Sequence, residues 1–346
     1  MRIDFLADIR RATDSQITAL NALTNEMRRE RFPDDPTVPL EEDLIRWRNV
    51  PDVFRVGEWL AWDHGRLVAE AHTEILLTNE NRHLLEFMIF VTKHLRRRGL
   101  ATRLLAGIAE YAARETRSVL MSFTFSSVPS GDAFMHRLGA EVGLETHTNQ
   151  LDLADLNRDL LPLWQERAAE RAAGYELVWW TGGYPEDAVE QVARVWDAMN
   201  RAPRGTLQME DFHFTAEHVR DFAKSDRERG NEVWSLVVRA RASGELAGFT
   251  EVSWHPNRPE IVQQRGTGVL DAHQNRGLGR WIKAAMLERI LRERPQVRRV
   301  RTGNADSNAP MLKINNELGF KPYVSHAVWQ VPLAQVRAYL DNVRAR

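Results

Sequence analysis

Residues 274–279 read Gln-Asn-Arg-Gly-Leu-Gly, and residues 96–101 read Arg-Arg-Arg-Gly-Leu-Ala. Each stretch follows an apolar run typical of a strand and opens an amphipathic helix. Glycine at such a turn lets the backbone come close to a ligand, and the first turn of a helix offers unpaired N–H groups and the positive end of its dipole. Because arginine adds positive charge, the pattern predicts a pyrophosphate cradle in each half of the chain.

The two turns belong to a longer repeated block. Gly99 and Gly277 are 178 residues apart, about half of the 346-residue chain. After the second turn, residues 304–311 read Asn-Ala-Asp-Ser-Asn-Ala-Pro-Met and residues 318–320 read Leu-Gly-Phe. The first half has a weaker version, Ser-Ser-Val-Pro-Ser at 126–130 and Leu-Gly-Ala at 138–140. Since the closing glycines are 180 residues apart, the spacing indicates a duplicated domain.

The composition fits a two-domain protein. Charged residues form 27% of the sequence, the formal net charge is −1, and there is no cysteine. This balance gives no global field toward nucleic acid or membranes, and the lack of cysteine excludes a disulfide framework and a thiol nucleophile. The N-terminus lacks the apolar core of a signal peptide, and no apolar run reaches membrane-spanning length. We therefore expect a cytoplasmic protein, monomeric or homodimeric, with no metal, nucleic-acid or membrane partner.

The hydrophobic pattern predicts the same order of elements in both halves. For the first half it predicts strands at 3–9, 54–62, 66–77, 84–91 and 118–125, and helices at 14–31, 40–49 and 100–115. For the second half it predicts strands at 175–181, 232–254 (as a hairpin), 266–270 and 297–302, and helices at 186–200, 216–229 and 278–293. Apolar residues at helical spacing over 155–173 indicate a connecting helix.

The repeated block resembles the acetyl-CoA-binding signatures of the GNAT acyltransferases, Arg/Gln-x-x-Gly-x-Gly/Ala after a strand and then an asparagine that begins a helix closing in Gly-Phe. The chain is identified as a tandem GNAT protein, an arrangement also found in mycothiol synthase. The resemblance implies an α/β (α+β) fold with two GNAT domains, each a mixed, mostly antiparallel sheet flanked by helices. We expect an N-terminal domain at 1–154, a connecting helix at 155–174 and a C-terminal domain at 175–346.

The resemblance implies acetyl-CoA as cosubstrate and places its contacts. Main-chain groups of the strand before the turn are expected to pair with the pantetheine arm. In the second half the expected cofactor residues are Val269, Leu270, Gln274, Arg276, Gly277, Leu278, Gly279, Arg280, Asn304 and Asn308. Weaker candidates in the first half are Arg96, Arg98, Gly99 and Ala101.

The catalytic groups follow from the reaction that the resemblance implies. A protonated amine cannot attack a thioester, so a base must remove its proton, and Glu251 is the candidate on its strand. The alternative for Glu251 is a solvent-facing strand carboxylate. Many GNAT enzymes carry a tyrosine as general acid four residues before the closing glycine, where this chain has Asn315. Tyr323 is a candidate replacement, with a core or rim tyrosine as the alternative.

The halves differ in this signature, because the first half has Ser127 and Ser130 near the positions of the second-half asparagines. We therefore expect a degenerate, mainly structural first domain and a catalytic second domain. Polar residues on the first half's strands could belong to a site or simply face outward: Glu70, His72, Glu74 and Glu86. The predicted function is direct acetyl transfer to a primary amine of a small molecule. The alternative is a non-catalytic CoA-binding or sensing protein.

Overall fold

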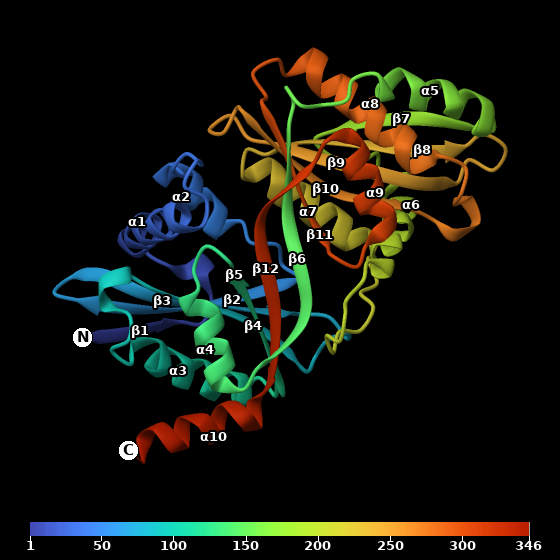
Figure 1. Cartoon of the computed structure of the whole chain (residues 1–346). Coiled ribbons are helices and arrows are strands. Elements are labelled where there is room, and N and C mark those ends of the chain that lie inside the picture. The colour runs from blue at the N-terminus through green and yellow to red at the C-terminus, as the bar shows by residue number, and fades with distance from the viewer. Residues whose placement is uncertain (346) are drawn as a thin grey trace. The chain divides into compact units, whose positions relative to one another are not determined.

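The computed structural model describes residues 1–345, and its helices and strands repeat in the same order in the two halves of the chain (Figure 1). Two compact units are formed. The first unit contains residues 1–146, 204–210 and the described residues from 324 onward; the second contains 147–203 and 211–323. The units therefore differ from the predicted linear ranges 1–154 and 175–346, because each takes a segment from the other half of the sequence.

The sheet of the first unit has the strand order β1-β2-β3-β4-β5-β12. All neighbours pair antiparallel except β4 and β5, which are parallel. The bounds are β1 (Arg2–Leu6), β2 (Phe54–Asp63), β3 (Arg66–Leu76), β4 (Leu84–Val91), β5 (Val119–Phe125) and β12 (Lys321–Pro332). The last strand of the chain thus completes the first unit.

The helices of the first unit cover both faces of its sheet (Figure 1). On one face α1 (Asp14–Arg31) and α2 (Leu40–Arg48) bury residues such as Ile17 and Leu20. On the other face α3 (Leu100–Arg114) packs with α10 (Leu333–Arg344), and α4 (Ser130–Leu138) lies beside β5. This arrangement leaves the N-terminus of α3 next to the end of β4.

The second unit repeats this arrangement with the strand order β6-β11-β10-β9-β8-β7. Strands β10 and β11 pair in parallel, and β7 to β10 pair antiparallel. The bounds are β6 (Glu141–Asp152), β7 (Tyr175–Thr181), β8 (Glu232–Ala240), β9 (Leu246–Trp254), β10 (Ile261–Val269) and β11 (Arg299–Ala305). Together the two units confirm the predicted fold class.

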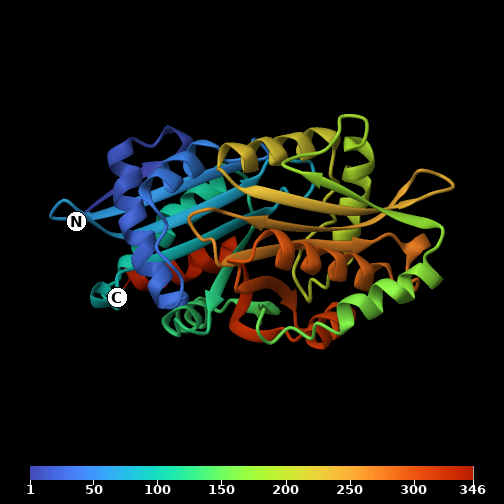
Figure 2. The same cartoon turned by 90° about the horizontal axis from the view of Figure 1, so that it is seen from above.

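Helices also cover both faces of the second unit's sheet (Figures 1 and 2). One face carries α8 (Leu278–Glu293) and α5 (Leu160–Arg171), the helix predicted as the connection, whose Trp164 is buried against it. The other face carries α6 (Val189–Trp196) and α7 (Ala216–Glu228). The helix α9 (Ala309–Leu318) follows β11 as α4 follows β5. Within residues 1–345, no helix is both long and apolar enough to cross a membrane.

Candidate functional site

The predicted cradle turn is present in both units. A single 3-10 turn, Lys93–Leu95 or Asp271–His273, follows the strand, and then Gly99 or Gly277 begins the helix with a φ of 78° or 81°. This left-handed conformation favours glycine, and no atom lies within 4 Å of the position that a Cβ would occupy at either glycine. No side chain caps the N-terminus of α3 or α8, so first-turn N–H groups remain available to an anion.

The parallel strands next to each cradle diverge before they end. In the first unit the pairing of β4 with β5 runs from Leu84–Val119 to Phe87–Ser122, although β4 continues to Val91. In the second unit the pairing of β10 with β11 ends at Gln263–Arg301. The end of β4 or β10 therefore has main-chain groups that are not paired with the parallel neighbour, as an added pantetheine strand requires.

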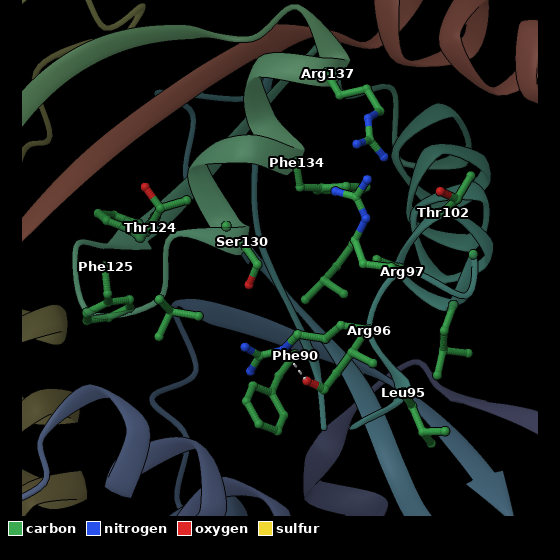
Figure 3. Close-up of a pocket in the computed structure, with 18 of the residues that line it drawn as sticks. Phe90, Leu95, Arg96, Arg97, Thr102, Thr124, Phe125, Ser130, Phe134 and Arg137 are labelled. Carbon is green, nitrogen blue, oxygen red and sulfur yellow. Dashed lines mark hydrogen bonds between the residues drawn. The ribbon is translucent and has the colours of Figure 1, made fainter. Parts of the chain in front are cut away.

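A cavity of about 280 Å³ occupies this place in the first unit (Figure 3). Its wall runs from the cradle turn, past the separated ends of β4 and β5, to the guanidinium of Arg31, which lies 4.2 Å from the Phe125 ring centroid. Arg97 from the cradle and Arg137 from α4 both reach toward the same part of the pocket. Neither arginine has an ion-pair partner among residues 1–345, so this end of the cavity offers two positive charges to an anion.

Two arginines of the first cradle, Arg96 and Arg98, are predicted cofactor residues, and their surroundings differ. Arg96 donates to Glu30 over 2.7 Å and to the Val91 carbonyl over 2.9 Å, so it joins α1 to the end of β4. This contact lowers the pKa of Glu30. Arg98 is exposed and does not line the cavity, whereas Gly99 and Ala101 do. The residues that sequence reasoning missed are Arg31, Arg97 and Arg137; the left-handed backbone of Arg97 carries no signal in the sequence.

In the second unit, side chains join α8 directly to α9. Arg280 forms a two-point ion pair with Glu317 at 3.0 and 2.9 Å and lies over the Trp164 ring. Deeper in, the buried amine of Lys283 donates to Asn315 Oδ1 over 2.7 Å. Burial lowers the pKa of Lys283 to about 7. The corresponding residues of the first unit, 178 or 180 positions earlier, are Thr102, Arg137, Leu105 and Met135, which form no such pairs.

The predicted second-unit site residues have mostly structural contacts. Asn315 is fully buried and donates to Asn304 Oδ1 over 2.7 Å, so its amide holds α9 to β11. Asn308 caps α9 by accepting from the Met311 N–H. Tyr323 stacks under the guanidinium of Arg301 at 4.6 Å.

The remaining cradle residues of the second unit also contact the protein. Gln274 donates to Asp271 over 3.0 Å, and the Leu270 N–H donates to the Ala247 carbonyl over 2.9 Å. Arg276 lies 6.0 Å from the Tyr175 ring centroid. Val269 packs against the apolar core, and Leu278 is buried, while Gly279 allows Ile314 to lie close to α8. The structure thus brings these residues together around one turn, and their binding of CoA stays a prediction.

A second cavity in the first unit, of about 230 Å³, lies between α1, α2 and the sheet. Its charged lining is mixed, with Asp43, Glu58 and Glu70 on the acidic side and Arg28, Arg31 and Arg46 on the basic side, and His72 also lines it. Arg31 lines both this cavity and the cradle cavity. Glu70 lies opposite Phe90 of β4, which belongs to the cradle cavity. The two cavities are therefore neighbours, and their junction is at Arg31.

Burial changes the pKa values of Glu58, Glu70 and His72 in this second cavity. It raises the pKa of Glu70 to about 8, with Glu58 acting in the same direction, and raises the pKa of Glu58 well above its usual value. It lowers the pKa of His72, whose Nδ1 lies 2.7 Å from Glu58 Oε1. Glu70 is 6% exposed, so the alternative of an outward-facing strand residue is wrong for it. Glu58, which is 1% exposed, was not among the residues predicted from the sequence.

The second unit has a cavity of about 370 Å³ at the equivalent face of its sheet. Glu251 lies at this cavity, 6% exposed, so the predicted alternative of a solvent-facing carboxylate is wrong. Its Oε1 accepts from Ser235 over 2.7 Å and from the Tyr184 hydroxyl. Burial raises the pKa of Glu251 to about 7, against a smaller opposing effect of Arg265.

Comparison with known proteins gives the family and the fold. A sequence model of the acetyltransferase (GNAT) family matches residues 20–140 and 194–320. No curated protein matches the sequence. A solved tandem GNAT protein from the clavulanic acid biosynthesis pathway is 24% identical with a TM-score of 0.76, covering 96% of this chain and 99% of that one.

Two further solved structures share the fold. A GCN5-related N-acetyltransferase from Sphaerobacter thermophilus is 15% identical, with a TM-score of 0.64 and coverage of 96% of both chains. The glucosamine N-acetyltransferase region of a fungal multi-domain GH3 β-N-acetylglucosaminidase is 13% identical, with a TM-score of 0.67, and the match covers 95% of this chain and 38% of that one. At these identities the structural matches show the fold alone.

Proposed function

Because the chain belongs to the acetyltransferase (GNAT) family, we propose that it transfers the acetyl group of acetyl-CoA directly to a primary amine of a small molecule, with the cofactor bound in the first unit. The observation that carries this proposal is the 280 Å³ cavity, which begins at the Gly99 cradle and ends at Arg31 beside the 230 Å³ cavity that Glu70 lines. A cofactor lying along it would bring its thioester to the junction with the cavity that Glu70 lines.

The charge of the cradles supports the first unit. Residues 93–103 include Lys93 and four arginines, a formal charge of +5, whereas the equivalent residues 271–281 include Asp271 and two arginines, a charge of +1. Phosphates at a helix N-terminus are stabilised by positive charge nearby. This proposal exchanges the roles predicted for the two halves. Catalysis by the second unit, with Glu251 as base, is the competing assignment.

Glu70 is the residue we assign as general base. It lies opposite Phe90 and so next to the cofactor cavity, and its raised pKa suits a group that takes a proton from an ammonium ion. In the reaction the ammonium proton moves to the Glu70 carboxylate, the amine nitrogen bonds to the thioester carbon, and the carbon–sulfur bond breaks. The CoA thiolate then takes a proton from solvent.

Arg31 supports this step from the junction of the two cavities. Its guanidinium is flanked by the Phe125 ring and shares the junction with Glu70. A fixed positive charge there would stabilise negative charge on the carbonyl oxygen and on the departing sulfur. Glu58 and His72 line the same cavity and offer acceptor atoms to the ammonium group, beside the guanidinium groups of Arg28 and Arg46.

Matched substitutions in the two cradles test whether the cofactor binds in the first unit. Gly99→Glu and Gly277→Glu each place a negative charge in one cradle, and Gly99→Ala and Gly277→Ala control for the strain of a side chain at positive φ. Calorimetric titration with acetyl-CoA, and CoA release with an amine panel, should show that Gly99→Glu lowers affinity and turnover at least about tenfold beyond its alanine control. Gly277→Glu should leave turnover near that of Gly277→Ala. The reverse result would assign catalysis to the second unit.

A cytoplasmic location, a monomeric or homodimeric state and the absence of nucleic-acid and membrane partners stay proposals. The expected absence of nucleic-acid and membrane partners rests on the near-neutral net charge of the sequence.

A further inference from the structure

The 370 Å³ cavity of the second unit has an aromatic wall. Tyr184, Trp196, Phe214 and Phe222 line it, and the Trp196 ring meets each of the other three edge to face. The Tyr184–Trp196 and Trp196–Phe214 centroids are 5.8 and 5.3 Å apart. Phe249 occupies the position that Glu70 has in the first unit. A cavity of this size with such a wall suits a small ligand with an apolar, preferably aromatic, body.

Glu251 is the polar group deep in this cavity that a ligand could pair with. Ser235 and Tyr184 hold one of its oxygens in place. Two other charged side chains at the cavity are engaged with each other, because Arg265 forms a two-point ion pair with Asp226 at 2.6 Å. The remaining charged residue that lines the cavity, Arg227, is exposed. The charge offered to a buried ligand is therefore one carboxylate.

The cradle beside this cavity differs from that of the first unit. Arg280 and Glu317 join α8 to α9, and Asp271 brings negative charge to the turn. Two glycines of β10 also let the segment after α6 lie close to the strand, since a Cβ on Gly268 would be 3.1 Å from the Ala198 Cβ. The second unit therefore has a cavity that contains a carboxylate and reaches Gly266 of β10, and a cradle turn less suited to phosphates.

We propose that the second unit binds an organic amine with an aromatic or apolar body, whose ammonium group pairs with Glu251, and that it does so without acetylating the amine. The part about acetylation rests on the proposed function, which places the cofactor in the first unit. The pocket would thus be a ligand-binding site separate from the cavity that Glu70 lines.

Phenethylamine is the probe, titrated into the full chain by calorimetry without acetyl-CoA. It should bind with an affinity at least about tenfold above that of 2-phenylethanol, which has the same ring and no charge. Glu251→Gln should lower phenethylamine affinity at least about tenfold and bring it near the value for the alcohol. The exposed Glu170→Gln on α5 is the matched control, and Glu70→Gln identifies any binding component in the first unit.

Several outcomes would overturn the proposal. Equal affinity for phenethylamine and 2-phenylethanol on the unmodified protein would do so without any variant, as would phenethylamine binding that Glu251→Gln leaves unchanged. A third is acetylated phenethylamine, detected by chromatography, that disappears with Gly277→Glu and persists with Gly99→Glu. That last result would also refute the proposed function. Both proposals would be supported if acetylated phenethylamine disappears with Gly99→Glu and phenethylamine binding is weakened by Glu251→Gln.

Discussion

The two units carry different side chains at equivalent positions of their sheets. In the first unit Glu58 of β2 lies opposite His72 of β3, and in the second Ser235 of β8 lies opposite Glu251 of β9. Each pair is joined by a 2.7 Å contact. The adjacent position is Glu70 in one unit and the Phe249 ring in the other, so a carboxyl group lines the first cavity where an aromatic ring lines the second. A duplicated scaffold can therefore keep two pockets while their ligands diverge.

Among the substitutions that test this difference between the units, the one at Glu70 is expected to have the largest effect on turnover. Glu70→Gln should lower kcat by about 10² to 10³, with acetyl-CoA affinity retained, because general base catalysis contributes on this scale. With a pKa of about 8 for Glu70, turnover of the native protein should rise as pH passes through 8 and the carboxyl ionises. The variant should keep only the rise due to the amine itself.

Glu74→Gln is the matched control for this substitution. Glu74 lies four residues further along the same strand and does not line either cavity of the first unit. It should change kcat less than about threefold. If Glu70→Gln keeps native turnover and an unchanged pH profile, Glu70 is not the general base, and Glu251 becomes the candidate base.

A second prediction concerns the arginine that differs between the units. Arg137→Glu introduces the residue type that the second unit has at Glu317, and it should weaken acetyl-CoA binding by about tenfold, since it replaces a positive charge at the cavity with a negative one. Arg98→Ala should change the affinity less than about threefold, because Arg98 does not line the cavity. Calorimetry measures both, and the opposite ranking would show that the phosphates lie on the other side of the turn.

The sequence predicted much of this and missed the rest for physical reasons. The Gly99 and Gly277 turns were predictable because a left-handed residue before a helix favours glycine. The strands β6 and β12 were missed, because their pairing partners lie far away in the sequence and local periodicity does not report partners. The part of β12 from Val324 onward belongs to the first unit and the part of β6 from His147 onward to the second, which is also why the units differ from the predicted linear domains.

The site residues show the same limit. Glu251 was identified from its place on a strand, but its burial, and that of Glu70, depends on helices that cover the sheet. Asn304 and Asn315 carry the right residue types for a cofactor site, and their bonds to each other and to Lys283 are visible only in three dimensions. Motif position alone cannot separate an amide that binds a ligand from one that joins two helices.

A third prediction uses pH to sharpen the distinction between the two cavities. Glu251 has a pKa of about 7, so its carboxylate form dominates at pH 8 and its neutral form at pH 6. Phenethylamine stays protonated across this range, and its affinity should therefore fall by about five- to tenfold between pH 8 and pH 6. Asp226 and Arg265 are paired with each other, and Arg227 is exposed, so Glu251 governs this change. Calorimetry with Glu251→Gln should show a flat profile, and a native profile that is flat as well would contradict the assignment.

The smallest expected effect is on stability, and it comes from the same carboxyl that we assign to catalysis. The folded pKa of Glu70 is about 8 against an ordinary value of 4.5, so between these values the folded protein binds the proton more tightly than the unfolded chain. The free energy of unfolding should therefore fall as pH rises from about 5 to 8. Glu70→Gln removes this group's contribution, so the variant should melt at least about 2 °C above the native protein at pH 8.5 and show little gain at pH 5. Thermal denaturation followed by circular dichroism measures the difference, with Glu74→Gln as control. Higher stability with lost turnover would identify Glu70 as a buried charge retained for function, whereas a variant destabilised at both pH values would indicate a structural role for its carboxyl.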